Sequence, residues 1–104
     1  MSEDTGPKLS FACQFDERTA LEVEQKGFFE HALVEFPNGV RVPICFWDPA
    51  RLAQDLETET RLGRVCIGEP GLIVLRKVTL KNMTAAVEEL YRRGYFDRLK
   101  SLFS

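Results

Sequence analysis

The stretch His31–Asp48, HALVEFPNGVRVPICFWD, decides how the chain folds, because it joins two apolar runs through a cluster of turn residues. Pro37 suits the second position of a type I turn. Gly39 can adopt the left-handed conformation of a bulge that follows such a turn. The stretch therefore predicts a β-hairpin with a three-residue loop.

The length of the loop fixes which residues of the two strands face each other. Three loop residues place Val34 opposite Val42 and Glu35 opposite Arg41. A two-residue loop would instead pair Phe36 with Arg41, which is chemically worse. We predict the first register, with Gly39 at positive φ.

The same register places Pro43 opposite Leu33, where the missing proline N–H costs no bond within the hairpin. On the side of this strand that faces away from the hairpin, Pro43 has no N–H to donate to a further strand. We therefore predict a free edge or a bulge near Pro43.

One face of the predicted hairpin is too apolar to be left in water. Its residues are Phe29, His31, Leu33, Cys45 and Trp47. The register sets Phe29 opposite Trp47 and His31 opposite Cys45. We expect this face to be covered by a helix of the chain itself, or else by a partner.

Length and composition indicate one small globular domain. The chain has 104 residues, 44% of them hydrophobic and 29% charged. The polar start predicts a mobile tail over residues 1–7, followed by a single domain over 8–104. No apolar run has the length of a membrane span and the start does not resemble a signal peptide, so we expect a cytoplasmic protein without membrane contact. The three separated cysteines, Cys13, Cys45 and Cys66, favour buried thiols over a disulfide framework.

Charge is distributed unevenly along the chain. Residues 1–60 hold twelve acidic and five basic side chains, whereas residues 61–104 hold four acidic and nine basic ones. The two halves could mix over one surface, or the second half could form a positive face that attracts an anion or an acidic partner.

Alternation and capping signals predict the remaining elements. Apolar residues alternate over 9–15, which predicts a strand. Residues 17–26 could form a helix between Asp16 and Gly27, but the alternation of Leu21 and Val23 with glutamates favours a strand. Residues 64–67 read as a short strand, and the apolar run 72–75 reads as a central strand covered on both faces.

Two principal helices are predicted. The first spans 49–62, with Asp48 as its N-cap and Pro49 at its first position. The second spans 82–93, capped by Asn82, and a short helix over 97–103 should bury Leu99, Leu102 and Phe103. The predicted fold is an α+β domain with a mainly antiparallel sheet of five to six strands and the helices packed on it.

Catalytic signals are sparse. A Cys45–His31 pair could form a thiolate nucleophile, but no third orienting residue or oxyanion donor can be named. One histidine and three distant cysteines do not make a zinc motif, and no phosphate-binding loop is present, so we expect neither metal nor cofactor.

The sequence therefore favours a non-enzymatic protein-interaction module. It would bind another protein, or itself, through the Phe29/Trp47 face or the strand edge near Pro43. The alternative is an anion- or nucleic-acid-binding domain that uses the basic C-terminal half, although the net charge of −2 argues against nucleic acid. The candidate binding residues are Phe29, Leu33, Trp47, Arg76, Lys77, Arg92 and Arg93.

Overall fold

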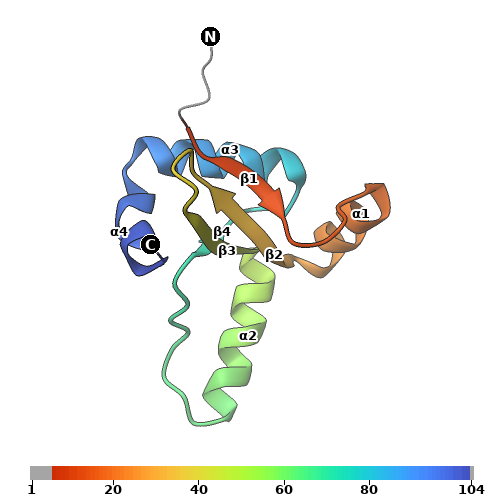
Figure 1. The fold of residues 1–104 in the computed structure, drawn as a ribbon. Helices are drawn as coiled ribbons and strands as arrows, with labels where there is room; N and C mark the ends of the chain where they lie inside the picture. Colours follow the sequence, from red (N-terminus) through yellow and green to blue (C-terminus); the bar gives the residue numbers. More distant parts are fainter. Residues whose placement is uncertain (1–5, 104) are drawn as a thin grey trace.

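A computed structural model describes residues 6–103 of the chain, and the side chains of residues 6–100 (Figure 1). The chain forms an α+β fold with four strands and four helices. In order these are β1 (Lys8–Phe11), α1 (Glu17–Lys26), β2 (Phe28–Glu35), β3 (Arg41–Trp47), α2 (Pro49–Arg61), β4 (Leu72–Val74), α3 (Leu80–Arg92) and α4 (Tyr95–Phe103). Most of the predicted tail, residues 1–5, lies outside the described residues.

The described strands form one mixed sheet in the order β1-β2-β3-β4. The pairs β1/β2 and β2/β3 are antiparallel, and β3/β4 is parallel. The α+β class is confirmed, but the expectation of five to six strands is wrong. Residues 17–26 are helical, and residues 64–67 have no strand.

Helix α1 replaces the strand predicted for residues 17–26 because both of its ends are capped. The side chain of Asp16 accepts a hydrogen bond from the Thr19 backbone N–H at 2.9 Å. Gly27 closes the other end in the left-handed conformation, at φ 79°. Leu21 is 62% exposed, and Val23 is the one residue of this helix that is buried. The alternation of Leu21 and Val23 with glutamates therefore belongs to a helix with a narrow buried face, and not to a strand.

The hairpin has the predicted register. Val34 lies opposite Val42 and Glu35 opposite Arg41, and the latter two form an ion pair at 3.0 Å. Gly39 has a φ of 91°. The turn chemistry and the apolar pattern are therefore sufficient to define this end of the sheet.

The prediction fails at the other end of the hairpin, where β2 contains a bulge. The pairing passes from Ala32–Ile44 directly to Phe29–Phe46, so two residues, Glu30 and His31, face Cys45 alone. An extra residue reverses the alternation of side chains beyond it. Phe29 consequently lies opposite Phe46, and not opposite Trp47.

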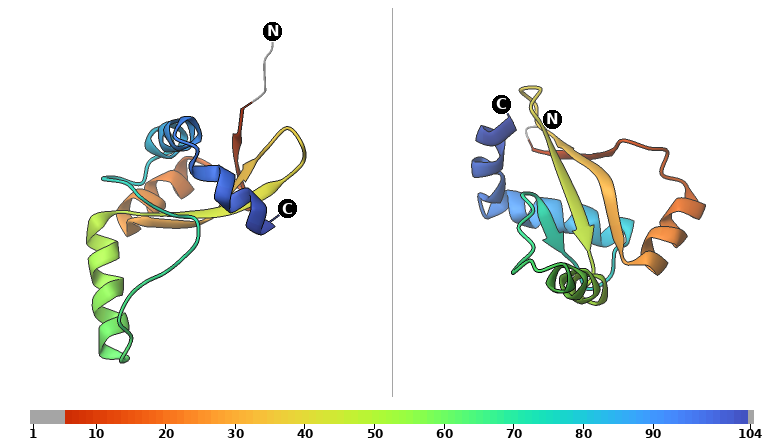
Figure 2. Two further views of the ribbon diagram at one scale, coloured as in Figure 1. Left: turned by 90° about the vertical axis from the view of Figure 1, so that its left-hand side faces the viewer. Right: turned by 90° about the horizontal axis from the view of Figure 1, so that it is seen from below.

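One face of the sheet forms the main core against α3 and α4 (Figure 2). The buried sheet residues on this face are Phe29, Ala32, Val34, Val42, Ile44, Phe46 and Ile73. Met83 and Val87 from α3 and Phe96 and Leu99 from α4 complete the same cluster. The burial predicted for Leu99 is confirmed, whereas the side chains of Leu102 and Phe103 lie outside the described set.

Helix α3 begins two residues earlier than predicted. Its N-cap is Thr79, whose hydroxyl accepts a hydrogen bond from the Asn82 backbone N–H at 3.2 Å. Asn82 therefore lies in the first turn and not at the cap. The apolar stripe predicted for this helix packs on the sheet through Met83 and Val87.

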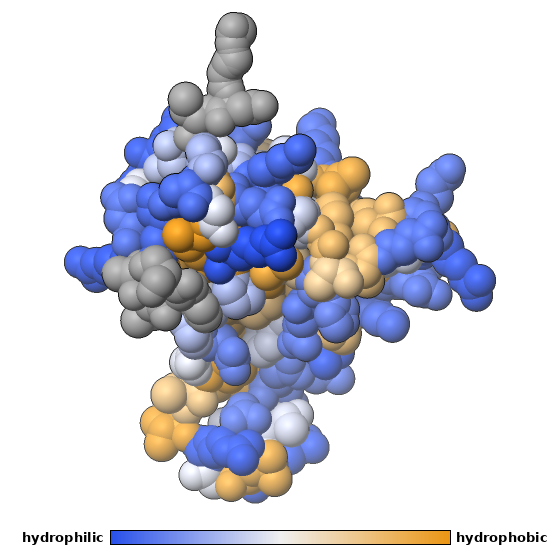
Figure 3. All heavy atoms as spheres, in the orientation of Figure 1, coloured by the Kyte–Doolittle hydropathy of each residue, from blue (hydrophilic) through white to orange (hydrophobic). Residues whose placement is uncertain are grey.

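Helix α2 and the return segment 62–70 project from one end of the sheet, below it in Figure 1. We call these residues the arm, and the sheet with the other three helices the body. The predicted N-cap is confirmed, since the Asp48 carboxylate accepts a hydrogen bond from the Arg51 backbone N–H at 2.7 Å. No residue of α2 is buried. Apolar side chains gather toward the end of the arm (Figure 3), where Leu56, Leu62 and Val65 are exposed.

Candidate binding groove

Strand β4 is the edge of the sheet and not the central strand that its apolar run predicted. It pairs with β3 on one side only, and Val74 is 46% exposed. A crossover from β3 through the arm brings the chain back parallel to β3, at the outside of the sheet. The apolar run is explained by Ile73, which enters the core, and not by burial on both faces.

The hydrogen bonds of β4 determine which of its backbone groups point outward. The Gly71 carbonyl accepts from the Cys45 N–H at 3.0 Å, and the Leu75 N–H donates to the Trp47 carbonyl at 2.9 Å. Alternate residues of a parallel strand point to opposite sides, so the backbone groups of Leu72 and Val74 face away from β3. The Leu72 N–H closes a turn onto the Glu69 carbonyl. Both of the outward carbonyls and the Val74 N–H have no partner among the residues that the structure describes.

A groove runs between this open edge and α3. It has a volume of about 500 Å³. One wall is formed by residues 73–76, and the other by one face of α3, which contributes Asn82, Ala85, Ala86, Glu89, Leu90 and Arg93. The methyl groups of Ala85 and Ala86 leave room that a longer side chain would fill.

The two walls are held together at one end of the groove. The Asn82 Nδ2 donates a hydrogen bond to the Lys77 carbonyl at 3.0 Å, and the Thr79 N–H donates to the same carbonyl at 3.1 Å. Val78, immediately after, is 1% exposed. The width of the groove is therefore set by a short connection anchored in the core.

Two arginines line the groove from opposite walls. Arg93 forms an ion pair with Glu89, one turn earlier in α3. Arg76 is exposed and has no ion-pair partner among the described side chains. Because exposed ion pairs contribute little to stability, the Glu89–Arg93 pair can rearrange at low cost when another carboxylate approaches.

A second cavity, of about 520 Å³, lies at the junction of α3 and α4. Its lining includes Gly71, which immediately precedes β4, Arg98 from α4, and Arg93, which also lines the groove. The two hollows therefore share a side chain and follow the same edge of the sheet.

The sequence-based binding residues are only partly brought together. Arg76 and Arg93 both line the groove. Lys77 follows Arg76, and its carbonyl accepts a hydrogen bond from Asn82. Arg92 is exposed and does not line the groove. Phe29 and Trp47 are 4% and 7% exposed. Because they lie on opposite faces of the sheet, the expected Phe29/Trp47 face does not exist.

Trp47 and Leu33 occupy the outer face of the sheet, away from α3. Trp47 is buried against α2 and the return segment, where it lines a small cavity with Asp55 and Ile67. This position agrees with the expectation that the helix at 49–62 covers it. Leu33 is half-buried opposite Pro43. Pairing with β4 begins only at Cys45, so the outer side of β3 is unpaired at Pro43, as its missing N–H predicted.

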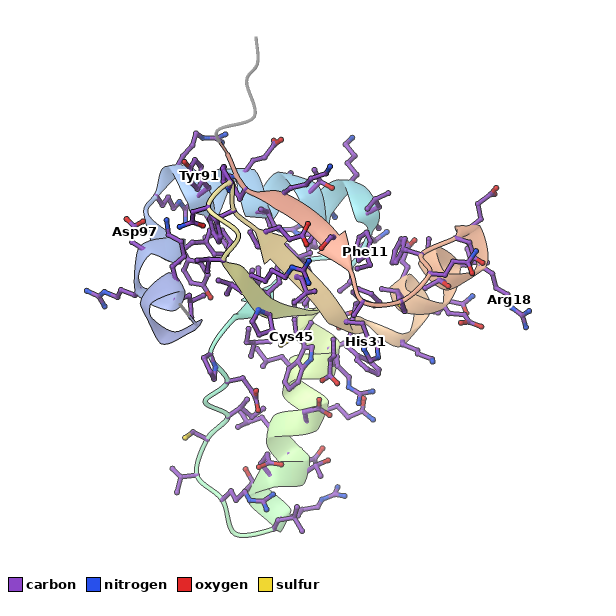
Figure 4. The ribbon with its side chains drawn as sticks, in the orientation of Figure 1. Phe11, Arg18, His31, Cys45, Tyr91 and Asp97 are labelled. Carbon is purple, nitrogen blue, oxygen red and sulfur yellow. The ribbon has the colours of Figure 1, made fainter. Side chains whose placement is uncertain are left out.

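The bulge places His31, together with Glu30, opposite Cys45. Figure 4 shows both residues at the end of the sheet from which α2 projects. No hydrogen bond joins their side chains among the described interactions, and His31 contacts the Phe29 ring, with centroids 5.9 Å apart. Burial, aided by the carboxylates of Glu30 and Glu69, raises the pKa of the Cys45 thiol to about 11. Such a thiol is a poor nucleophile at neutral pH.

The other two cysteines are exposed, contrary to the buried thiols that their apolar neighbours predicted. Cys13 follows β1 after its strand has ended, and Cys66 lies in the arm. Among residues 6–103, no three His, Cys, Asp or Glu side chains converge as a metal site would require. None of the helices in this range is both long and apolar enough to cross a membrane.

Comparison of the chain with protein-family models, with curated proteins and with solved structures finds no match. The groove therefore has to be interpreted from its own geometry.

Sequence reasoning identified the two arginines of the groove but not its apolar walls. One signal was available: the helix predicted between the strand ending at Trp47 and the run 72–75 is the connection that a parallel pair needs. A parallel fourth strand after such a crossover lies at an edge unless a further strand follows. None was predicted after residue 75.

Proposed function

We propose that this chain is a non-enzymatic protein-interaction module that binds an extended segment of a partner along β4. The segment would add a strand to the sheet, using the outward backbone groups of Leu72 and Val74. The observation that carries this proposal is the open edge of β4 beside a groove of about 500 Å³.

The walls of the groove support this mode of binding. In an added strand, alternate side chains point to the same face of the sheet. On the α3 side they would meet Ala86 and Leu90, where the groove is apolar, while the remaining side chains would face solvent. Backbone bonds would supply affinity, and the pocket beside α3 would supply selectivity.

The opposite edge of the sheet offers less to a partner. On β1, Leu9 and Phe11 pack against the core, and Phe11 also stacks on Phe15 with ring centroids 4.4 Å apart. The hollow near this edge is lined by Pro7 and Pro37, which have no N–H to donate. We therefore place the binding edge at β4.

Selection from a random peptide library displayed on phage tests the proposal, because it requires no knowledge of the partner. Val74→Pro removes the outward N–H without removing a bond to β3, so the fold should persist. Peptides selected on the wild-type protein should bind this variant at least about tenfold more weakly. Val65→Pro is the matched control, since Val65 is 92% exposed in the arm.

A second pair of variants tests the groove wall. Ala85→Phe should fill the groove and weaken the selected peptides by a similar factor of about ten. Ala53→Phe places the same side chain on an exposed position of α2 and should have no effect. Failure to select peptides, or equal binding by all four variants, would contradict the proposal.

A further inference from the structure

We infer that the segment bound along β4 is acidic, with a carboxylate placed between Arg76 and Arg93. This inference rests on the proposed function and specifies the chemistry of its partner. The two arginines stand on opposite walls of the groove, so an extended chain lying between them would pass both guanidinium groups.

The local charge is unbalanced in favour of an anion. Residues 76–98 carry six basic and three acidic side chains, whereas residues 1–60 are strongly acidic. Arg76 has no ion-pair partner among the described residues, and Glu89 already pairs with Arg93. An incoming carboxylate can therefore bind Arg76 without competing with an internal one.

The neighbouring cavity extends this positive field along the edge. Arg93 lines both hollows, and Arg98 lines the second. An acidic residue near the end of the bound segment would reach the junction of α3 and α4, where Glu69 is the acidic side chain of the lining. The field would thus steer an acidic segment toward the groove before contact.

Charge also argues against a second copy of this chain as the occupant. Two copies that paired along β4 would each bring a groove of the same charge to the contact, with Arg76 and Arg93 in both copies. Like charges that face each other across strands are unfavourable. A partner of opposite charge fits the edge better.

Three end-blocked nonapeptides test the inference; each alternates valine with threonine, and its central valine is replaced by glutamate, by glutamine or by lysine, on the face that enters the groove. Fluorescence anisotropy with labelled peptides should rank glutamate first, about tenfold above glutamine at about 50 mM salt. This preference should shrink to about twofold at about 500 mM salt, because screening weakens exposed charge interactions.

Charge reversal of the groove should reverse the preference. Arg76→Glu should weaken the glutamate peptide and strengthen the lysine peptide. Arg18→Glu is the matched control, since Arg18 lies on α1 on the far side of the body (Figure 4) and, among the described side chains, pairs with Glu22. The control should bind all three peptides as the wild type does.

The outcomes separate this inference from the proposed function. If the glutamine peptide binds as tightly as the glutamate peptide and Val74→Pro weakens both, the acidic preference is wrong while strand addition stands. If none of the three peptides binds and library selection also fails, the proposed function itself is wrong. Dimerisation of the protein that Val74→Pro abolishes would place a second copy in the groove and overturn the inference. Tighter binding of a labelled single-stranded oligonucleotide, lost in Arg76→Glu, would also overturn it.

Discussion

Helices α2 and α3 have the same length of 13 residues but are stabilised in different ways. Helix α3 buries Met83 and Val87 in the core, whereas α2 buries no residue at all. Trp47 is buried where the arm joins the sheet, but Leu62 and Val65 toward its end are exposed. The body therefore depends on apolar burial, whereas the arm packs on the body at its base, through Trp47, and depends beyond that on interactions within itself.

The interactions of the arm are mostly local in sequence. Arg51 pairs with Asp55 at 3.1 Å, and Arg64 reaches back to Glu59 at 3.2 Å. The base is fixed by the Asp48 cap and by the Arg51 guanidinium, which lies 4.1 Å from the centre of the Phe28 ring. Ion pairs that are exposed or only part-buried, as these are, contribute less than about 1 kcal/mol each, so the arm should open locally while the body stays folded.

The largest difference should appear on truncation of apolar side chains. Phe46→Ala in the body removes a side chain with 0% exposure and should lower the free energy of unfolding by about 3–5 kcal/mol. Leu56→Ala in the arm, where the side chain is 41% exposed, should change it by less than about 0.5 kcal/mol. Urea denaturation with constant m-values measures both. A loss above about 2 kcal/mol for Leu56→Ala would mean that the arm packs on the body through Leu56 as well as at its base.

Two glycines sharpen the comparison because both have positive φ. Gly71 has a φ of 86°, and a Cβ there would lie 2.7 Å from the Pro43 carbonyl oxygen. Gly63 has a φ of 83° with open space around it. Gly71→Ala should cost about 2–4 kcal/mol, and Gly63→Ala only about 1 kcal/mol of backbone strain. Equal losses in thermal or urea unfolding would show that the close approach of β4 to Pro43 is not tight.

Loss of the α2 cap should affect the arm far more than the body. Asp48→Ala removes the acceptor for the Arg51 N–H and should cost about 1 kcal/mol. Hydrogen exchange should become faster in α2, while amides of α3 around Val87 keep their protection. A uniform loss of protection in both helices would contradict independent opening of the arm.

The sequence predicted the parts of the fold that depend on local chemistry. Pro37 and Gly39 define the hairpin turn, and Asp48 and Pro49 define the start of α2. Asp16 and Gly27 carried the same kind of information for α1, yet the alternation of Leu21 and Val23 was given more weight. On a largely exposed helix the capping residues were the better guide.

The bulge and the position of β4 could not be predicted in this way, because both depend on contacts distant in sequence. Nothing local to Glu30 and His31 indicates that both will face Cys45. The bulge returns Phe29 to the core, where it contacts Phe15 of the segment before α1, with ring centroids 5.4 Å apart. The candidate site divides in the same way. Arg76 and Arg93 could be picked out of the sequence as basic residues, but the groove between them forms only when the fold brings β4 and α3 together.

At neutral pH the smallest effect on stability concerns the thiols, whose reactivity also differs between the arm and the body. With iodoacetamide at about pH 8, exposed Cys66 in the arm should react at least about tenfold faster than Cys45, whose pKa of about 11 leaves little thiolate. Mass spectrometry of the digested protein measures both rates.

The raised pKa of Cys45 also makes stability depend on pH. As pH rises through the ordinary thiol pKa of 9.0, the unfolded chain loses the Cys45 proton before the folded chain does. The folded state then holds more protons, so this contribution to stability is complete below about pH 9 and decreases between about pH 9 and 11. Cys45→Ala should remove that part of the decrease. Fast alkylation of Cys45 that His31→Ala abolishes would instead restore the pair as a reactive centre.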